Sequence, residues 1–370
     1  MVNAESGLEP LAPLSKPALA MRYALLGAIV LGVAAAFAYT GGWFSPHALT
    51  GARIIDTFEQ VNGVAPGFRR NHAKGVGFSG SFLSNGRGAA LSKASVFEPG
   101  AMPVPVIGRF ALGGGQPYAA DTASNVRSMA LSFQLRGGEE WRTGMNDIPV
   151  FPVNSAAAFH ELLLASLPDA TTGKPNPGNM PAFLSRNPAS AKALQLIKSA
   201  PKSSGFENDS YQSLNAFLFV NAAGNATPVR WSMVPVQATD TAKPAPAAAL
   251  AGKNYLFDRL GEAVAHQPLQ FRLMVVVGQP GDPTADATLP WPKERVSLDV
   301  GTLTIDRLHG EADSPARDLN FDPLVLPSGI QGSDDPLLSA RALAYSASFT
   351  RREGEPKKIS AVSVPQAGTR

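Results

Sequence analysis

The chain has 370 residues, of which 44% are hydrophobic and 16% are charged, a composition typical of a folded globular protein. It contains no cysteine, which excludes disulfides, cysteine-ligated zinc, iron–sulfur clusters and a thiol nucleophile. Its net charge of +3 comes from scattered lysines and arginines without a dense basic run, so we expect no nucleic-acid partner.

The first apolar segment, residues 23–44, carries no charged side chain and is long enough to cross a bilayer. Lys16 and Arg22 precede it, which by the positive-inside rule predicts residues 1–22 in the cytoplasm and the rest of the chain outside it. Ala36-Phe37-Ala38 would also suit a signal peptidase, which would release the body of the chain into the same compartment, the periplasm in a bacterium. We favour an anchor over a cleaved signal because the preceding polar segment is long. A buried core helix is the least favoured interpretation.

The remaining residues, 45–370, are interpreted as one domain. Its 35 glycines and 32 prolines are spread along most of the chain, which argues against long helices. Runs rich in β-branched and aromatic residues predict strands at Met129–Leu135, Ala216–Val220, Val229–Val236, Leu269–Val277 and Val296–Ile305. Helical periodicity predicts helices at Ser155–Ser166, Pro181–Ser199, Lys253–Ala265 and Asp335–Arg352.

Two connecting segments complete this organisation. Residues 221–227 (NAAGNAT) separate two predicted strands and favour a hairpin. Residues 239–252, rich in alanine and proline, predict a surface connection. Strands in hairpins with helices grouped around them indicate an α+β fold with a curved or closed antiparallel sheet.

A pair of residues near the C-terminus has a specific chemical rationale. Arg341 and Tyr345 lie four positions apart in a predicted helix and therefore on one face of it. A guanidinium beside a phenol stabilises the phenolate, and a phenolate is a ligand for ferric haem iron. The pattern alone is weak, because such a spacing occurs by chance in many helices.

His72 is one of five histidines and has a distinctive setting. It lies in the run Arg69-Arg70-Asn71-His72-Ala73-Lys74-Gly75, where arginines and small residues surround it. An imidazole can accept a proton and return it near neutral pH, which suits general acid–base catalysis. The more common alternative for a single histidine is a structural or surface role.

These residues fall within motifs that resemble those of the haem catalases. His72-Ala73-Lys74-Gly75 resembles their distal-histidine motif, and Gly108-Arg109-Phe110 resembles the Arg-Phe strand that follows it. The other similar motifs occur in family order: Asn146 to Phe151, Trp291-Pro292, Val300 to Leu303, Phe321 to Pro323, Pro327 to Ile330 and Ser333 to Pro336. The chain is most similar to the small, membrane-anchored catalase-related peroxidases, which implies an antiparallel β-barrel of catalase type surrounded by helices.

The resemblance also implies a haem b cofactor and a role for each matching residue. Tyr345 would be the axial iron ligand, supported by Arg341, and His72 would be the distal acid and base. Three arginines would bind the haem propionates, and an aromatic residue would stack on the haem: Arg69, Arg109, Arg352 and Phe159.

Two positions depart from the family pattern as we align it. Ala111 stands where the family usually has a serine that orients the distal histidine, so His72 is expected to lose a hydroxyl partner. Asp147 stands where a distal asparagine is usual, with Asn146 one residue before it. Either Asn146 serves the site or Asp147 replaces it, and a carboxylate there would raise the pKa of His72.

The implied activity is that of a haem peroxidase (EC 1.11.1.-) that reduces organic peroxides with a separate electron donor, and hydrogen peroxide is a further candidate substrate. The two departures predict weak or no catalase activity. The first alternative is a fatty-acid hydroperoxide isomerase resembling allene oxide synthase, which would need no donor. The second is a non-enzymatic haem-binding protein. The sequence leaves the donor, the physiological peroxide and the oligomeric state open.

Overall fold

The computed structural model describes residues 15–40, 49–100, 102–124, 126–237 and 252–364. The chain divides into two compact units, Met1–Leu49 and Thr50–Arg370. The first unit contains the helix α1 (Lys16–Thr40), and the second contains every strand described below and the remaining helices. Residues 239–251 of the predicted surface connection lie outside the described residues.

Helix α1 is apolar over most of its 25 residues, and none of them is buried. It is long and apolar enough to cross a membrane, and a signal sequence would have the same properties. It begins at Lys16, before the predicted start at residue 23, with Pro17 in the first turn, where proline is tolerated. Residues 41–44 of the predicted segment lie outside the described residues.

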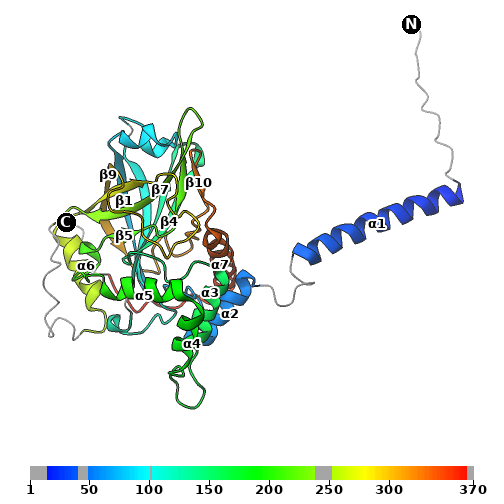
Figure 1. Cartoon of the computed structure of the whole chain (residues 1–370), viewed down its shortest axis with the longest axis horizontal. Coiled ribbons are helices and arrows are strands. Elements are labelled where there is room, and N and C mark those ends of the chain that lie inside the picture. Colours follow the sequence, from blue (N-terminus) through cyan, green and yellow to red (C-terminus); the bar gives the residue numbers. More distant parts are fainter. Residues whose placement is uncertain (1–14, 41–48, 101, 125, 238–251, 365–370) are drawn as a thin grey trace, which may run out of the picture. The chain divides into compact units, whose positions relative to one another are not determined.

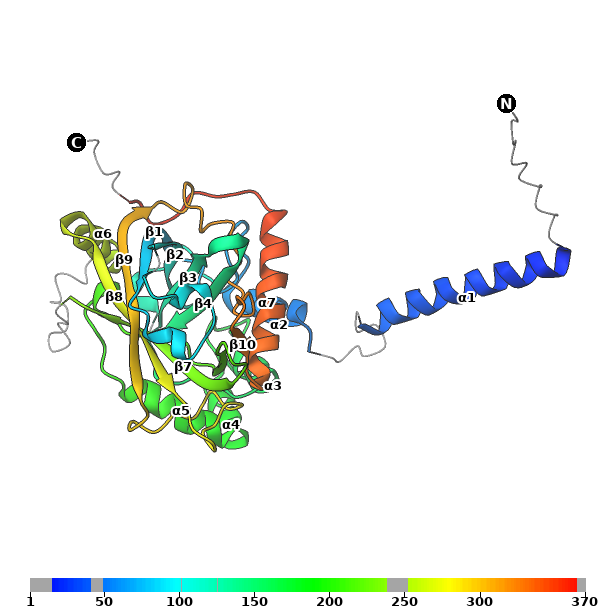
Figure 2. The same cartoon turned by 90° about the horizontal axis from the view of Figure 1, so that it is seen from above.

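The second unit is built around a closed antiparallel β-barrel (Figures 1 and 2). Eight strands follow one another in the order β7-β5-β4-β3-β2-β1-β9-β8, and β8 pairs with β7 to close the ring. Strands β6 and β10 extend the sheet beyond β7. The strand bounds are β1 Gly75–Ser84, β2 Val104–Leu112, β3 Arg127–Gln134, β4 Glu140–Asn146, β5 Tyr211–Gln212, β6 Phe217–Val220, β7 Ala226–Pro235, β8 Leu269–Val277, β9 Ser297–His309 and β10 Ile330–Gly332.

Large aromatic side chains make up much of the core. Trp141 stacks on Phe133 with ring centroids 4.7 Å apart and meets Trp231 edge to face at 5.1 Å. Successive side chains of a strand point to opposite faces of the sheet, so the burial of alternate residues follows from the pleat. Each fully buried aromatic ring contributes about 1.5–3 kcal/mol through loss of contact with water. This core holds the strands rigidly, and the candidate site depends on their register.

Helices cover the outside of the barrel, and two of them pack closely together. Their bounds are α2 Gly51–Asn62, α3 Ala156–Ala165, α4 Asn179–Arg186, α5 Pro188–Ser199, α6 Tyr255–His266 and α7 Pro336–Glu353. Figure 2 shows α7 alongside the barrel with α2 beside it. A Cβ on Gly51 would lie 2.4 Å from the carbonyl oxygen of Leu343, so this contact requires a glycine. Single turns of 3-10 helix occur at Arg87–Ala90, Ser95–Phe97, Asp121–Ala123, Arg136–Gly138 and Phe206–Asn208.

The predicted α+β fold with a closed antiparallel sheet is confirmed, and so is the hairpin, which joins β6 to β7. The helix predicted over Pro181–Ser199 is wrong in one respect: it is two helices, because Pro188 begins a new one. Asn187, the residue before that proline, has φ −123° and ψ 72°, since proline disfavours a helical conformation there. The strand and helix patterns did not predict α2, β1, β2, β4, β5 or β10, and β2 was expected only from the resemblance of Gly108-Arg109-Phe110 to the Arg-Phe strand of the family.

Candidate active site

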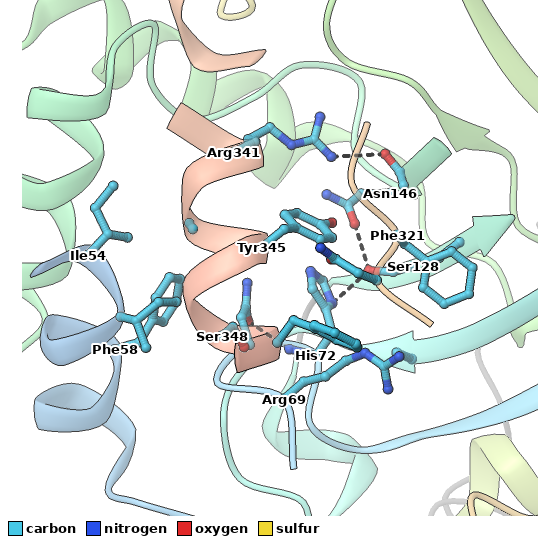
Figure 3. Close-up of a pocket in the computed structure, with 18 of the residues that line it drawn as sticks. Ile54, Phe58, Arg69, His72, Ser128, Asn146, Phe321, Arg341, Tyr345 and Ser348 are labelled. Carbon is cyan, nitrogen blue, oxygen red and sulfur yellow. Dashed lines mark hydrogen bonds between the residues drawn. The ribbon is translucent and has the colours of Figure 1, made fainter. Parts of the chain in front are cut away.

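A single cavity brings together residues from the barrel and from three helices (Figure 3). The barrel contributes residues of β2, β3 and β4 and the segment before β1, and the helices are α2, α3 and α7. All but one of the site residues predicted from the sequence line this cavity: Arg69, His72, Arg109, Asn146, Phe159, Arg341, Tyr345 and Arg352. Asp147 is the exception.

Helix α7 presents four of its side chains to the cavity along one face. Arg341, Tyr345, Ser348 and Arg352 are spaced by four, three and four residues, which places them in one stripe. The helix starts sharply because Asp335 caps it, accepting a hydrogen bond from the Leu337 amide, and Pro336 occupies the first turn. The start of the helix therefore fixes the positions of all four side chains.

The guanidinium of Arg341 is held by two contacts. It donates to the Asn215 side-chain oxygen and, at 3.1 Å, to the carbonyl oxygen of Gly144 on β4. Asn215 in turn donates to the capping residue Asp335 at 2.8 Å. A Cβ on Gly144 would lie 3.0 Å from the Tyr345 phenol oxygen, so Arg341 and Tyr345 both lie against this glycine. The phenol oxygen of Tyr345 makes no hydrogen bond within the residues that the structure describes and remains open to the cavity.

The backbone of His72 adopts an unusual conformation that its neighbours fix. Its φ of 55° lies in the left-handed region, which residues other than glycine rarely occupy. The Asn71 side-chain oxygen accepts from the His72 amide at 3.0 Å and from the Gly114 amide at 2.8 Å. Arg109 donates to the His72 carbonyl at 2.8 Å. Together these hydrogen bonds hold the His72 backbone in its left-handed conformation and orient the imidazole into the cavity.

The imidazole of His72 has a hydroxyl partner after all. Its Nδ1 lies 2.9 Å from the hydroxyl of Ser128 on β3, and that hydroxyl lies 2.6 Å from the side-chain oxygen of Asn146 on β4. Figure 3 shows this chain of hydrogen bonds. The expectation from Ala111 was therefore wrong: Ala111 pairs directly with Ser128 across the sheet, and the hydroxyl comes from the neighbouring strand.

Burial, and after it the charges of Arg109, Arg341 and Arg69, together lower the pKa of His72 to about 3. The expectation that a carboxylate would raise this pKa is wrong, because guanidiniums rather than carboxylates dominate the surroundings of the ring. His72 is therefore a neutral imidazole at physiological pH and can accept a proton.

Asn146 and Asp147 point in opposite directions. Asn146 ends β4 with its side chain in the cavity, and Asp147, the next residue, accepts a hydrogen bond from the Arg127 amide at 2.9 Å outside the cavity lining. Burial, and after it the nearby charge of Asp209, together raise the pKa of Asp147 to about 6. The alternation of side chains along an extended strand separates the two residues, without a register change.

Three arginines form a buried cluster at the cavity. Arg69 and Arg109 share the carboxylate of Glu311, with closest N–O distances of 3.1 and 3.2 Å. The guanidinium of Arg352 donates to the Arg317 carbonyl, and its Nε has no hydrogen-bond partner within the described residues. Burial, and after it the charge of Arg109, together lower the pKa of Arg352 to about 10. The cluster holds three positive charges around one hydrogen-bonded carboxylate, an arrangement that favours binding of a further anion.

The rest of the cavity wall is apolar. Phe159 on α3 packs against Phe58 of α2 and Phe151, with ring centroids 5.7 and 5.8 Å apart. Ile54 and Ile55 of α2 add aliphatic surface. Phe159 therefore lines the cavity as one member of an aromatic cluster.

Sequence reasoning did not identify several residues of the cavity. Ser128, Ser348 and Phe321 line it, and Phe321 also lies below the Arg69 guanidinium, whose central carbon is 5.8 Å from its ring centroid. Ser348 could have been found from the helical stripe that contains Arg341 and Tyr345. Ser128 could be found only once the pairing of β2 with β3 was known.

Comparison with known proteins gives one consistent result. The family model described as "Catalase" matches residues 39–367. A protein of Synechococcus elongatus named "Catalase-related peroxidase" is 34% identical over 309 residues, which cover 84% of this chain and 90% of that protein. A protein of Mycolicibacterium paratuberculosis with the same name is 31% identical over 309 residues, covering 83% of this chain and 96% of its own length.

A solved structure shows the same fold. "Structure of a bacterial catalase" superimposes with a TM-score of 0.69 at 21% identity, covering 84% of this chain and 63% of that one. This chain thus spans less than two thirds of that larger catalase, but nearly the whole of the two smaller relatives. Together with the match to the family model, these findings show that the chain belongs to the catalase family, among the catalase-related peroxidases.

Proposed function

We propose that this protein is a haem b peroxidase that reduces organic hydroperoxides to alcohols with a separate electron donor. The observation that supports this most strongly is the cavity itself, where a tyrosine phenol, a neutral imidazole and a buried arginine cluster face the same space. Relatives named catalase-related peroxidases support the reaction type.

The donor groups of the cavity fit a haem. The phenol oxygen of Tyr345 is open to the cavity, and Arg341 lies beside it, as a phenolate ligand of ferric iron requires. Arg69, Arg109 and Arg352 carry three positive charges with one hydrogen-bonded carboxylate, Glu311. Two propionates would neutralise the excess, because carboxylates pair strongly with guanidiniums.

The polar residues of the cavity would have separate roles. The bound haem supplies the redox chemistry with the peroxide. His72 accepts the hydroperoxide proton and returns it to the oxygen that leaves as the alcohol. Asn146 lies beside His72 and orients the peroxide through its amide. In the overall reaction a hydroperoxide, two electrons and two protons give an alcohol and water, and the donor supplies the electrons.

The preference for organic peroxides is supported by the apolar wall. Ile54, Phe58 and Phe159 would surround an alkyl or aryl group, whereas hydrogen peroxide gains nothing from such a surface. The argument from Ala111 and Asp147 for weak catalase activity no longer applies, because Ser128 and Asn146 occupy the site. We retain weak catalase activity as a consequence of the apolar wall alone.

We also propose that α1 anchors the protein in a membrane with the catalytic unit outside the cytoplasm. The helix is apolar and has no buried residue, and Lys16 and Arg22 lie near its start. In a bacterium this places the enzyme on the periplasmic side, in contact with peroxides from outside or from lipid.

The test is consumption of cumene hydroperoxide by the haem-loaded protein with a dye as electron donor. His72→Ala is expected to lower the second-order rate constant about a hundredfold or more, because the proton acceptor is lost. His266→Ala, on α6 and outside the cavity, is the matched control and should keep the wild-type rate. Equal rates for both variants would contradict the role of His72. Conversion without any donor would indicate an isomerase instead.

A further inference from the structure

We infer that Ser128 is the positioning residue of the distal site and fixes which nitrogen of His72 carries the proton. The inference rests on the proposed function. It concerns a residue that the sequence motifs did not single out, on a different strand from the position where a serine is usual. It is supported by the His72–Ser128 and Ser128–Asn146 hydrogen-bond distances and by the register of β2, β3 and β4.

Hydrogen-bond chemistry fixes the direction of the chain from His72 to Asn146. The Ser128 hydroxyl has one proton, and it lies 2.6 Å from the side-chain oxygen of Asn146, which can only accept. The hydroxyl must therefore accept from Nδ1 of His72, 2.9 Å away, so Nδ1 carries the ring proton. Since burial keeps the ring neutral, Nε2 holds the free lone pair.

The same chain orients Asn146. With its oxygen turned to Ser128, its amino group remains free to donate, and it makes no hydrogen bond within the described residues. The Ser128 hydroxyl thus leaves Nε2 of His72 free to accept a proton and the amino group of Asn146 free to donate a hydrogen bond. A hydroperoxide needs both, because it gives up one proton and its oxygen atoms accept hydrogen bonds.

The strand register explains why Ser128 can take this place. Ala111 on β2, Ser128 on β3 and Asn146 on β4 are direct cross-strand partners, and all three line the cavity. Directly paired residues have Cβ atoms only about 4.5–5.5 Å apart. A serine hydroxyl at position 128 on β3, instead of at position 111 on β2, can therefore still reach the imidazole of His72. Only a hydroxyl at 128 lies between His72 and Asn146 and contacts both.

The first experiment reads the position of the proton rather than the activity. Wild-type protein with 15N-labelled histidine is loaded with gallium protoporphyrin, a diamagnetic substitute for haem, and long-range 1H–15N correlation NMR assigns the tautomer of each ring. His72 is identified by its absence from His72→Ala. We expect the His72 proton on Nδ1. A proton on Nε2 would overturn the inference.

The second experiment uses three variants of the haem-loaded enzyme. Ser128→Ala should lower the second-order rate constant with cumene hydroperoxide about tenfold to a hundredfold and give a mixed tautomer of His72. The double variant Ala111→Ser/Ser128→Ala should restore the Nδ1 tautomer and part of the rate, because it returns the hydroxyl but not the bond to Asn146. Ser132→Ala is the control, since Ser132 lies on the same strand as Ser128 but outside the cavity lining, and its hydroxyl donates to Glu140 on β4.

The outcomes separate this inference from the proposed function. If wild type binds haem and consumes the hydroperoxide, but Ser128→Ala matches Ser132→Ala in rate and tautomer, the inference fails and the function stands. If wild type binds no haem, both fail. If Ser128→Ala does not fold, the wild-type tautomer and the double variant still decide the question.

Discussion

The backbone of His72 is a strained part of the candidate site. A left-handed backbone at a residue with a side chain costs about 1–3 kcal/mol, and it persists only where the surroundings enforce it. Here the Asn71 side chain and the Arg109 guanidinium bond to its amide and carbonyl. Gly75 permits this, because a Cβ there would lie 2.5 Å from the Arg109 guanidinium carbon. The arginine that binds an anion in our proposal thus also holds the histidine.

Asp147 provides a test of stability against pH. The pKa of its carboxyl is about 6 in the folded chain and about 3.9 in an unfolded one, because it is buried near Asp209. Between these values the folded state holds a proton that the unfolded state releases. Raising the pH from 3 to 7 therefore lowers the free energy of unfolding by up to about 3 kcal/mol.

Asp147→Asn is expected to remove this decrease in the free energy of unfolding at higher pH. The variant should be about 1–3 kcal/mol more stable than wild type at pH 7.5 and about equally stable at pH 3, where the carboxyl is largely protonated in both states. Urea unfolding at both pH values measures the difference. The control is Asp334→Asn, an exposed carboxylate near the start of α7. A stability difference between wild type and Asp147→Asn that does not depend on pH would contradict the explanation.

Several site residues could be predicted from the sequence because their chemistry depends on short spacings. Arg341 and Tyr345 share a helical face whatever the tertiary structure, and His72 lies in a distinctive run. Ser128 could not be predicted, because its role arises from pairing with Ala111 and Asn146 on other strands. The orientation of Asp147 depended on where β4 ends, and element boundaries are the least predictable feature of a sequence.

At the scale of elements, the contact between α2 and α7 determines one wall of the cavity. α2 carries Ile54 and Phe58, and α7 carries Tyr345. The helices approach closely at Gly51, where a Cβ would lie 2.4 Å from the Leu343 carbonyl oxygen. Sequence periodicity predicted α7, and α2 was missed although Ile54, Ile55 and Phe58 recur in it at helical spacing.

Gly51→Val is expected to push these helices apart. We expect a loss of about 1–3 kcal/mol in the free energy of unfolding of the haem-loaded protein, from overpacking at a contact with no free space. Thermal unfolding followed by circular dichroism measures it. Ala52→Val, the exposed neighbour on the same helix, should cost less than about 1 kcal/mol, because only helix propensity changes. Equal losses for the two variants would show that the close contact is not important.

At the scale of the whole molecule, the closed barrel brings together residues that are far apart in sequence. Residues from Ile54 to Arg352 meet in one cavity, and they reach it from separate strands and helices. Strand-like runs and a hairpin predicted a curved or closed sheet, but only the family resemblance implied a barrel, because no local pattern encodes the pairing of β7 with β8 that closes it. Closure leaves the buried arginines near one another, with an excess of positive charge that a dianionic haem would neutralise.

The absorption spectrum of the haem-loaded protein, compared between wild type and Tyr345→Phe, tests the central claim most directly. We predict that wild type binds haem and shows a Soret band with high-spin ferric features, as expected for a tyrosine-ligated iron. Tyr345→Phe should lose the haem or change its spectrum, because the ligand oxygen is removed. A wild-type protein that gains no Soret band on addition of haem, or a Tyr345→Phe variant with the wild-type spectrum, would contradict this account.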